Sequence, residues 1–88
     1  MTHTWVKSVC LSHYRFVSTF PFKKLTFEEC YKHYVEFLYL CKLQPKQTIV
    51  ANKMADFMWH AHLQDHQNYQ LDTIRMLGRV LDHRNDFQ

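Results

Sequence analysis

The scarcity of turn-forming residues is the strongest constraint on how this chain folds. Its 88 residues contain one glycine, Gly78, and two prolines, Pro21 and Pro45. A β-sandwich or barrel needs a turn about every 8–12 residues, and glycine and proline supply many of these turns. Hydrophobic residues make up 47% of the chain, which excludes a disordered protein. Since so short a chain supports one core, residues 1–88 are expected to form a single all-α domain, a small bundle of about four helices.

Hydrophobic spacing and a capping motif predict the first two helices. The first is expected from Thr4 to about Phe20, because Pro21 removes a backbone donor. The second begins at a capping box, in which Thr26 and Glu29 satisfy each other's backbone N–H groups, and ends before the second proline. Its apolar residues recur at three- and four-residue steps, which is typical of one helix face. They are Phe27, Cys30, Tyr31, Tyr34, Phe37, Leu38 and Cys41.

Two further N-cap residues predict a third and a fourth helix. Asn52 is expected to cap a helix that runs to about residue 62 or 63. Asp65 is a second N-cap, and the helix after it is expected to end at Gly78, where glycine suits a C-terminal cap. A single helix over residues 53–77 is the alternative.

The charge distribution bears on the kind of partner. Eight basic and three acidic residues give residues 1–53 a charge of +5, while three basic and five acidic residues give residues 54–88 a charge of −2. A basic half attracts polyanions, but here the basic residues are scattered and only Lys23 and Lys24 are adjacent. Nucleic-acid binding is therefore the weakest hypothesis, and a protein partner is preferred.

The cysteines indicate the compartment. Cys10, Cys30 and Cys41 are odd in number and show no metal or redox spacing. Because Cys30 and Cys41 lie in an apolar helical pattern, they are expected to be buried free thiols in a reducing, intracellular and cytoplasmic setting. No signal peptide is visible, and no segment approaches the roughly 20 apolar residues of a membrane span.

Histidines and aspartates gather in the last third of the chain. Imidazole and carboxylate are common ligands of Zn²⁺ and non-haem iron, so a metal site is considered. Residues two positions apart on a helix diverge by about 200°, so His60 and His62 do not bind one ion on a continuous helix. An unbroken helix instead brings His62 together with Asp65 and His66. If the chain turns near residue 64, His60, His62 and His83 form a three-histidine site, and spacing does not choose between the two sets.

A structural interpretation of these histidines is favoured over a metal site, and a metal site over catalysis. A buried histidine beside Trp59 needs hydrogen-bond partners, because an unpaired buried polar group costs about 1–3 kcal/mol. Asp56, Asp72 and Asp82 are the candidate partners. No glycine-rich phosphate loop and no H-E-x-x-H helix are present. No residue is therefore assigned a catalytic role, and the chain is expected not to be an enzyme.

The segment from Asp56 to His62 reads D-x-x-W-H-x-H and is followed by a tyrosine, an aspartate, a glycine and a histidine. This arrangement resembles the glycine-rich domain-containing protein-like family of plants, fungi and bacteria. The resemblance covers about residues 22–84. It implies the following signature positions: Asp56, Trp59, His60, His62, Tyr69, Asp72, Gly78 and His83.

Three departures separate this chain from the family pattern. Thr73 stands where the motif usually has cysteine, His66 where bacterial members tend to have threonine, and Ala51 where proline is common. The first departure argues against an essential cysteine at that position. The resemblance implies a short stand-alone member of the kind carried by bacteria or large DNA viruses, which in the viral case places it in the host cell. Because no enzymatic activity is established for the family, the resemblance bears on the fold and the signature residues and not on a mechanism.

The functional hypotheses are ranked accordingly. The first is a non-enzymatic interaction or structural protein whose W-H-x-H segment organises a polar core or groove. The second is a zinc or iron protein with an open position that activates water, as a hydrolase does. The third is nucleic-acid binding through the basic half. Neither the partner nor the oligomeric state follows from the sequence.

Overall fold

Four helices make up the part of the chain that the computed structural model describes, residues 4–14 and 26–82. They are α1 (Thr4–His13), α2 (Phe27–Leu43), α3 (Lys53–Leu63) and α4 (His66–Leu77), and these ranges contain no strand. The predicted all-α bundle of four helices is therefore confirmed. None of the described helices combines the length and the hydropathy needed to cross a bilayer.

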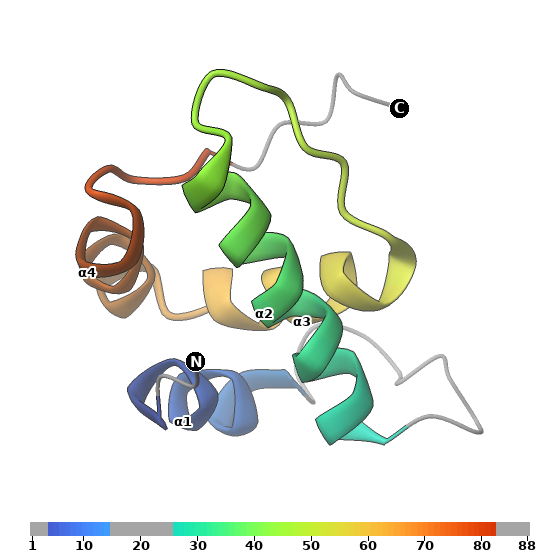
Figure 1. Cartoon of the computed structure of the whole chain (residues 1–88). Helices are drawn as coiled ribbons and strands as arrows, with labels where there is room; N and C mark the ends of the chain where they lie inside the picture. Colours follow the sequence, from blue (N-terminus) through green and yellow to red (C-terminus); the bar gives the residue numbers. More distant parts are fainter. Residues whose placement is uncertain (1–3, 15–25, 83–88) are drawn as a thin grey trace.

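The longest helix, α2, organises the packing of the others. It crosses in front of α3, and α1 and α4 lie to one side of this crossing (Figure 1). Its contact with α3 is the most extensive in the molecule, and α1 packs mainly against α3. The core lies where the helices meet, and Tyr34, Met58 and His62 are the largest side chains that it fully encloses.

Capping and hydrophobic spacing place α2 as predicted. The Thr26 hydroxyl accepts a hydrogen bond from the Glu29 backbone N–H at 3.2 Å, and the Glu29 carboxylate accepts one from the Thr26 N–H at 3.0 Å. All predicted stripe residues are buried except Phe27, which is half-buried and packs against the core. The capping residues and the buried face thus both predict the same helix.

The separation of α3 from α4 is also confirmed, and the alternative of one long helix is wrong. Asn52 accepts from the Ala55 N–H at 2.8 Å, and Asp65 accepts from the Asn68 N–H at 3.2 Å. Each helix therefore has its own N-cap, and the chain turns between them. The fourth helix ends at Gly78, which adopts the left-handed conformation with a φ of 78°.

The first helix begins at Thr4, as predicted. Its α-helical part ends at His13, and Tyr14 has a 3₁₀ conformation. Val6 and Cys10 are the enclosed residues of α1, Trp5 and Tyr14 are half-buried against the core, and Leu11 is exposed. The rest of the predicted helix, residues 15–20, lies outside the described ranges.

Replacing Gly78 tests the C-terminal cap of α4. A Cβ built at this position meets no atom within 4 Å, so the cost of a side chain comes from the backbone conformation alone. Gly78→Ala is expected to lower the free energy of unfolding by about 1–2 kcal/mol, measured by urea denaturation. Gly78→Asn is the matched control and should cost less, because asparagine tolerates this conformation better. Equal losses in the two variants would contradict the conformational explanation.

Candidate functional site

The two histidines of the W-H-x-H segment lie on different sides of α3. His62 is fully buried, whereas the side chain of His60 is 42% exposed and its Nε2 lies 3.4 Å from Asp56 Oδ2. The chain does turn near residue 64, but α3 is continuous through Leu63. The expectation that such a turn brings His60 and His62 together is therefore wrong, because the helical rotation between them is preserved.

Both ring nitrogens of His62 are hydrogen-bonded inside the core. Nε2 lies 2.8 Å from Asp72 Oδ2, and Nδ1 lies 2.7 Å from the Tyr34 hydroxyl oxygen. Since a carboxylate only accepts, Nε2–H is the donor to Asp72, and Nδ1 accepts the O–H of Tyr34. The hydrogen bonds therefore run in one direction, from α2 through α3 to α4. Asp72 is one of the three partners predicted for a buried histidine.

Cys10 brings the first helix to the same centre. Its Sγ is the donor in a 4.0 Å contact with the Met58 backbone oxygen, and the side chain is completely buried. Burial raises the pKa of the Cys10 thiol, and the nearby negative charge of Asp72 raises it further. We call Cys10, Tyr34, His62 and Asp72 the polar centre, in which Cys10 contacts the backbone of α3 and the other three side chains form the hydrogen-bond chain.

Burial determines the protonation states at this centre. It lowers the pKa of His62 from its ordinary value of 6.5, although the hydrogen bond and charge of Asp72 act in the opposite direction. Burial also raises the pKa of Tyr34 well above its ordinary value. The imidazole is therefore neutral and the phenol protonated at pH 7, as the direction of the hydrogen bonds requires.

A second hydrogen-bond chain connects Trp59 to the segment after α4. The indole N–H of Trp59 donates to the Tyr69 hydroxyl at 2.8 Å, and that hydroxyl donates to the backbone oxygen of Leu81. The Tyr69 ring also meets the His62 ring edge-on, with centroids 4.9 Å apart. Two signature positions therefore fix where the chain runs beyond Gly78.

Thr73, the residue at the usual cysteine position, has a local structural role. Its side chain is buried, and its hydroxyl donates to the backbone oxygen of Tyr69 at 2.9 Å within α4. Among the three cysteines, Cys30 is buried in the core and burial raises the pKa of its thiol. Its sequence neighbour His33 accepts a hydrogen bond from the Asn52 side chain at 3.2 Å. Cys30 therefore lacks the environment of an activated nucleophile.

Neither predicted set of metal ligands is assembled among the described residues. Across residues 4–14 and 26–82, no three His, Cys, Asp or Glu side chains are grouped so as to hold an ion. His62 has both nitrogens engaged, and Asp65 uses its carboxylate to cap α4 and to approach His13 at 3.5 Å. His66 is exposed, so the set of His62, Asp65 and His66 is not assembled. His83 of the other set lies outside the described residues.

The polar centre has the order of a nucleophile, a base and an orienting carboxylate, but its position excludes reaction with a substrate. Tyr34 and His62 have no exposed surface, and Asp72 is 3% exposed. Throughout the described ranges, every buried side-chain nitrogen and oxygen has a hydrogen-bond partner. What this arrangement achieves is a fully satisfied polar network inside a helical core, which specifies one packing of the helices.

Sequence reasoning missed two members of the centre. The sequence pattern places Tyr34 on the apolar stripe of α2 and Cys10 in the first helix, and it predicts polar partners for neither. The available signal was that a buried tyrosine hydroxyl needs a partner, and a histidine predicted to be buried needs two.

No protein-family model, curated protein or solved structure matches the chain. The resemblance to the glycine-rich domain-containing protein-like family therefore depends on the signature residues themselves. Of these, Trp59, His62, Tyr69 and Asp72 are buried and hydrogen-bonded to one another or to the core.

Removing the Tyr34 hydroxyl tests the polar centre. Tyr34→Phe leaves Nδ1 of His62 buried without a donor, so the free energy of unfolding is expected to fall by about 1–3 kcal/mol in urea denaturation. Tyr39→Phe is the matched control: its side chain is 55% exposed, and the change should stay within about 0.5 kcal/mol. A Tyr34→Phe protein as stable as the control would show that the hydroxyl contributes nothing.

The lowered pKa of His62 predicts acid sensitivity. Below pH 6.5 the unfolded chain binds a proton that the folded His62 resists, so its contribution to stability is complete above that pH and is lost as pH falls through the folded pKa. Denaturation from about pH 8 to about pH 5 should show this loss, and His62→Gln should reduce it while the exposed control His66→Gln does not. If the His62→Gln protein does not fold, the pKa of the His62 ring is measured by NMR in the native protein instead. A ring that titrates above pH 6.5 would contradict the assignment.

Proposed function

We propose that the chain is a non-enzymatic protein-binding module of the glycine-rich domain-containing protein-like family, in which the W-H-x-H segment forms the polar core. The observation that supports this proposal is the complete burial of the Tyr34–His62–Asp72 chain. Its groups have the right identities for catalysis but no access to a substrate. Their role is to hold α2, α3 and α4 in one arrangement. Surface residues then bind the partner protein.

The division of the motif between core and surface agrees with this role. Trp59 and His62 face inward and make hydrogen bonds to Tyr69 and Asp72. The remaining polar pair, Asp56 and His60, lies at the surface of α3. Four of the eight signature positions thus support the helix packing through buried hydrogen bonds.

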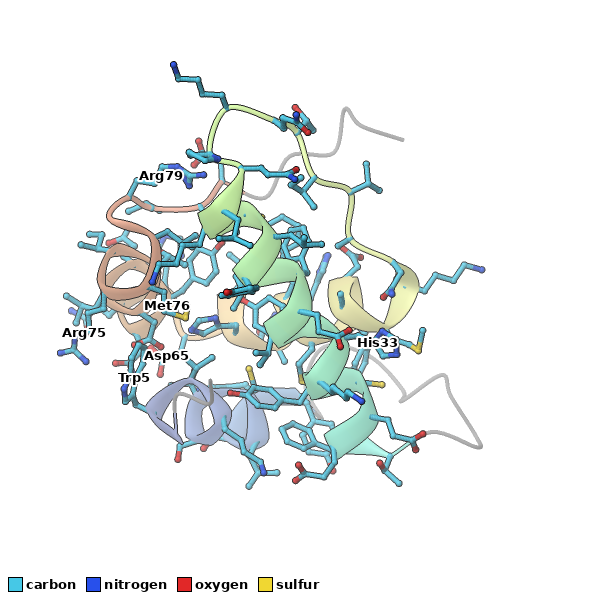
Figure 2. All side chains as sticks on the ribbon, viewed as in Figure 1. Trp5, His33, Asp65, Arg75, Met76 and Arg79 are labelled. Carbon is cyan, nitrogen blue, oxygen red and sulfur yellow. The ribbon has the colours of Figure 1, made fainter. Side chains whose placement is uncertain are left out.

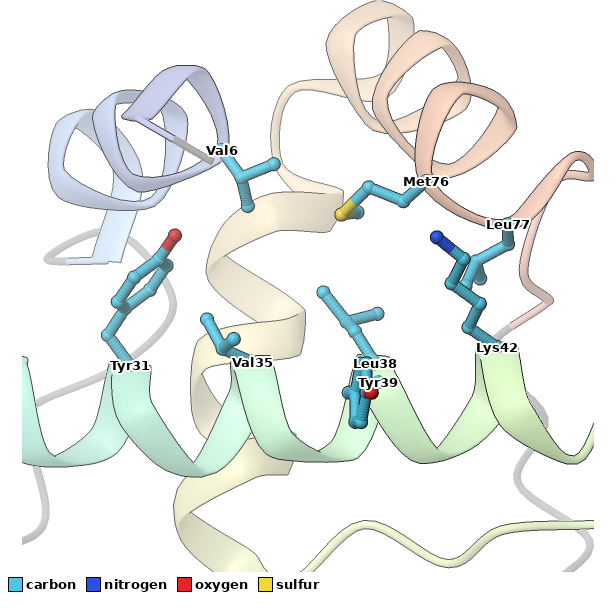
Figure 3. A pocket seen from close by; sticks show the side chains of 8 residues that line it. All are labelled: Val6, Tyr31, Val35, Leu38, Tyr39, Lys42, Met76 and Leu77. Atoms are coloured by element: carbon cyan, nitrogen blue, oxygen red, sulfur yellow. The ribbon is translucent and has the colours of Figure 1, made fainter. Parts of the chain in front are cut away.

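The best candidate for a binding surface is an apolar groove in which α2 forms the floor and α1 and α4 form the sides. Figure 3 shows Val6 and Met76 pointing from the two sides toward α2, above Tyr31, Val35 and Leu38. We call this the α1/α2/α4 groove. Its cavity is narrow, about 40 Å³, which suits a single apolar side chain inserted as an anchor.

The chemistry of the groove favours an amphipathic helix with acidic residues as its occupant. Lys42 is the one lining residue with a formal charge, and it has no ion-pair partner among the described residues. It lies beside Leu77 at one end of the groove (Figure 3). Tyr39 and Leu43 extend the apolar surface along α2, since both are more than half exposed. An apolar helix face would fill the groove, and a carboxylate beside it would pair with the lysine.

Two matched substitutions test this function. Tyr39→Glu places a negative charge in the groove, and Leu71→Glu places one on α4 at almost the same exposure, 52% against 55%. The partner is first captured with the wild-type protein and purified, and its affinity for each variant is then measured by calorimetry. We expect Tyr39→Glu to weaken this affinity at least about tenfold and Leu71→Glu to change it little. Circular dichroism would establish that both variants are folded.

Equal binding by the two variants would overturn the groove as the binding surface. Stoichiometric zinc or iron in untagged protein after exhaustive dialysis would instead support the metal hypothesis. Hydrolytic activity that survives purification and disappears in His60→Ala would contradict a non-enzymatic role.

A further inference from the structure

A larger and more polar concavity lies on the other side of the C-terminal half of α2. It is bounded by α2, by the connector over residues 44–51 and by the segment over residues 79–82. Its volume of about 500 Å³ falls within the range of about 300–1,000 Å³ typical of small-molecule sites. We call it the connector cleft. The α1/α2/α4 groove shares none of its lining residues.

The floor of the connector cleft is aromatic and rigid. The rings of Phe37 and Trp59 lie with centroids 4.7 Å apart at 48°, and Cys41 lies beside them. The indole N–H is held by Tyr69, so the floor is fixed by the same hydrogen bonds that hold the helices. Ile49 and Leu81 provide apolar walls. Such a surface suits a planar aromatic or a branched apolar group.

One cation lies next to this apolar floor. Arg79 lines the cleft, is half-buried, and has no ion pair with any described residue. Figure 2 places it beyond the end of α4, near the last turn of α2. Burial raises the pKa of the Cys41 thiol, and the positive charge of Arg79 opposes part of that rise, so the guanidinium acts on the floor of the cleft.

We propose that the connector cleft binds a small organic carboxylate with an aromatic or branched apolar body. The apolar body lies on the Phe37–Trp59 floor, and the carboxylate pairs with the Arg79 guanidinium. A planar guanidinium binds a carboxylate through two parallel hydrogen bonds, which gives the pair both strength and orientation. The inference is independent of the protein-binding function, because it concerns a different surface and a different class of ligand.

Arg79, and not the second charged residue of the cleft, sets the sign of the ligand. Asp82 also lines the cleft, but it is exposed, whereas Arg79 is half-buried. An ion pair gains more where water is partly excluded, so the arginine decides recognition and the aspartate contributes a weak repulsion. The cleft therefore selects an anion over an amine with the same apolar body.

Tryptophan fluorescence provides a direct test. The chain has two tryptophans, and Trp5→Phe leaves Trp59 as the sole reporter on the cleft floor. Three probes share one aromatic body: 3-phenylpropanoate, 2-phenylethylamine and L-phenylalanine. We expect a saturable change in Trp59 emission with 3-phenylpropanoate at millimolar concentrations, weaker binding of the zwitterion and none of the amine.

Three charge variants in the same background locate the contact. Arg79→Gln is expected to weaken 3-phenylpropanoate binding at least about tenfold, the loss of about 1.4 kcal/mol. Arg75→Gln is the matched control and should bind as before, since Arg75 is exposed and does not line the cleft. Asp82→Asn should leave binding unchanged or tighten it. Urea denaturation would confirm that all three proteins are folded.

Three results would overturn the proposal. One is the absence of a saturable response up to about 10 mM 3-phenylpropanoate, which is about ten times a Kd of 1 mM. Another is equal binding by the Arg79→Gln and Arg75→Gln proteins. The third is tighter binding of L-phenylalanine than of 3-phenylpropanoate together with a loss on Asp82→Asn, which would assign the cleft to a zwitterion.

Discussion

The two hydrogen bonds of the His62 ring are the constraint on which the rest of the structure depends. An imidazole with no exposed surface needs a partner at each nitrogen, and here these partners come from α2 and α4. A rotation of any one of the three helices would leave Tyr34, His62 or Asp72 buried and unpaired. Hydrophobic burial makes the helices associate, and this chain of hydrogen bonds determines which association is native.

Sequence reasoning located the elements well because their signals are local. Capping residues such as Thr26, Asn52 and Asp65 act within one helical turn, so their effect is visible without a structure. The convergence of Tyr34 on His62 depends on how α2 crosses α3, and nothing in the sequence between these residues, which lie 28 positions apart, encodes that crossing locally. The metal hypotheses had the same weakness, because ligand spacing alone says nothing about nitrogens already engaged in the core.

The core and the two concave surfaces are physically connected. Trp59 is buried in the core and also forms the floor of the connector cleft, while Met76 and Tyr31 belong to the core and also line the α1/α2/α4 groove. In a domain this small, the residues that stabilise the fold also shape its surfaces. A substitution in the signature motif therefore changes both stability and surface geometry, and the two effects separate only when folding is measured alongside binding.

The polar centre also dictates an order of assembly. Its contacts span 10 residues from His62 to Asp72, 28 from Tyr34 to His62 and 48 from Cys10 to Met58. Closing a short loop costs less entropy than closing a long one, so the α3–α4 pair is the cheapest unit to form first. Yet this pair alone leaves Nδ1 of His62 to water until α2 docks. The hydrogen bond from Tyr34 to His62 thus forms only when α2 has docked. It couples the early local unit to a cooperative, all-or-none fold.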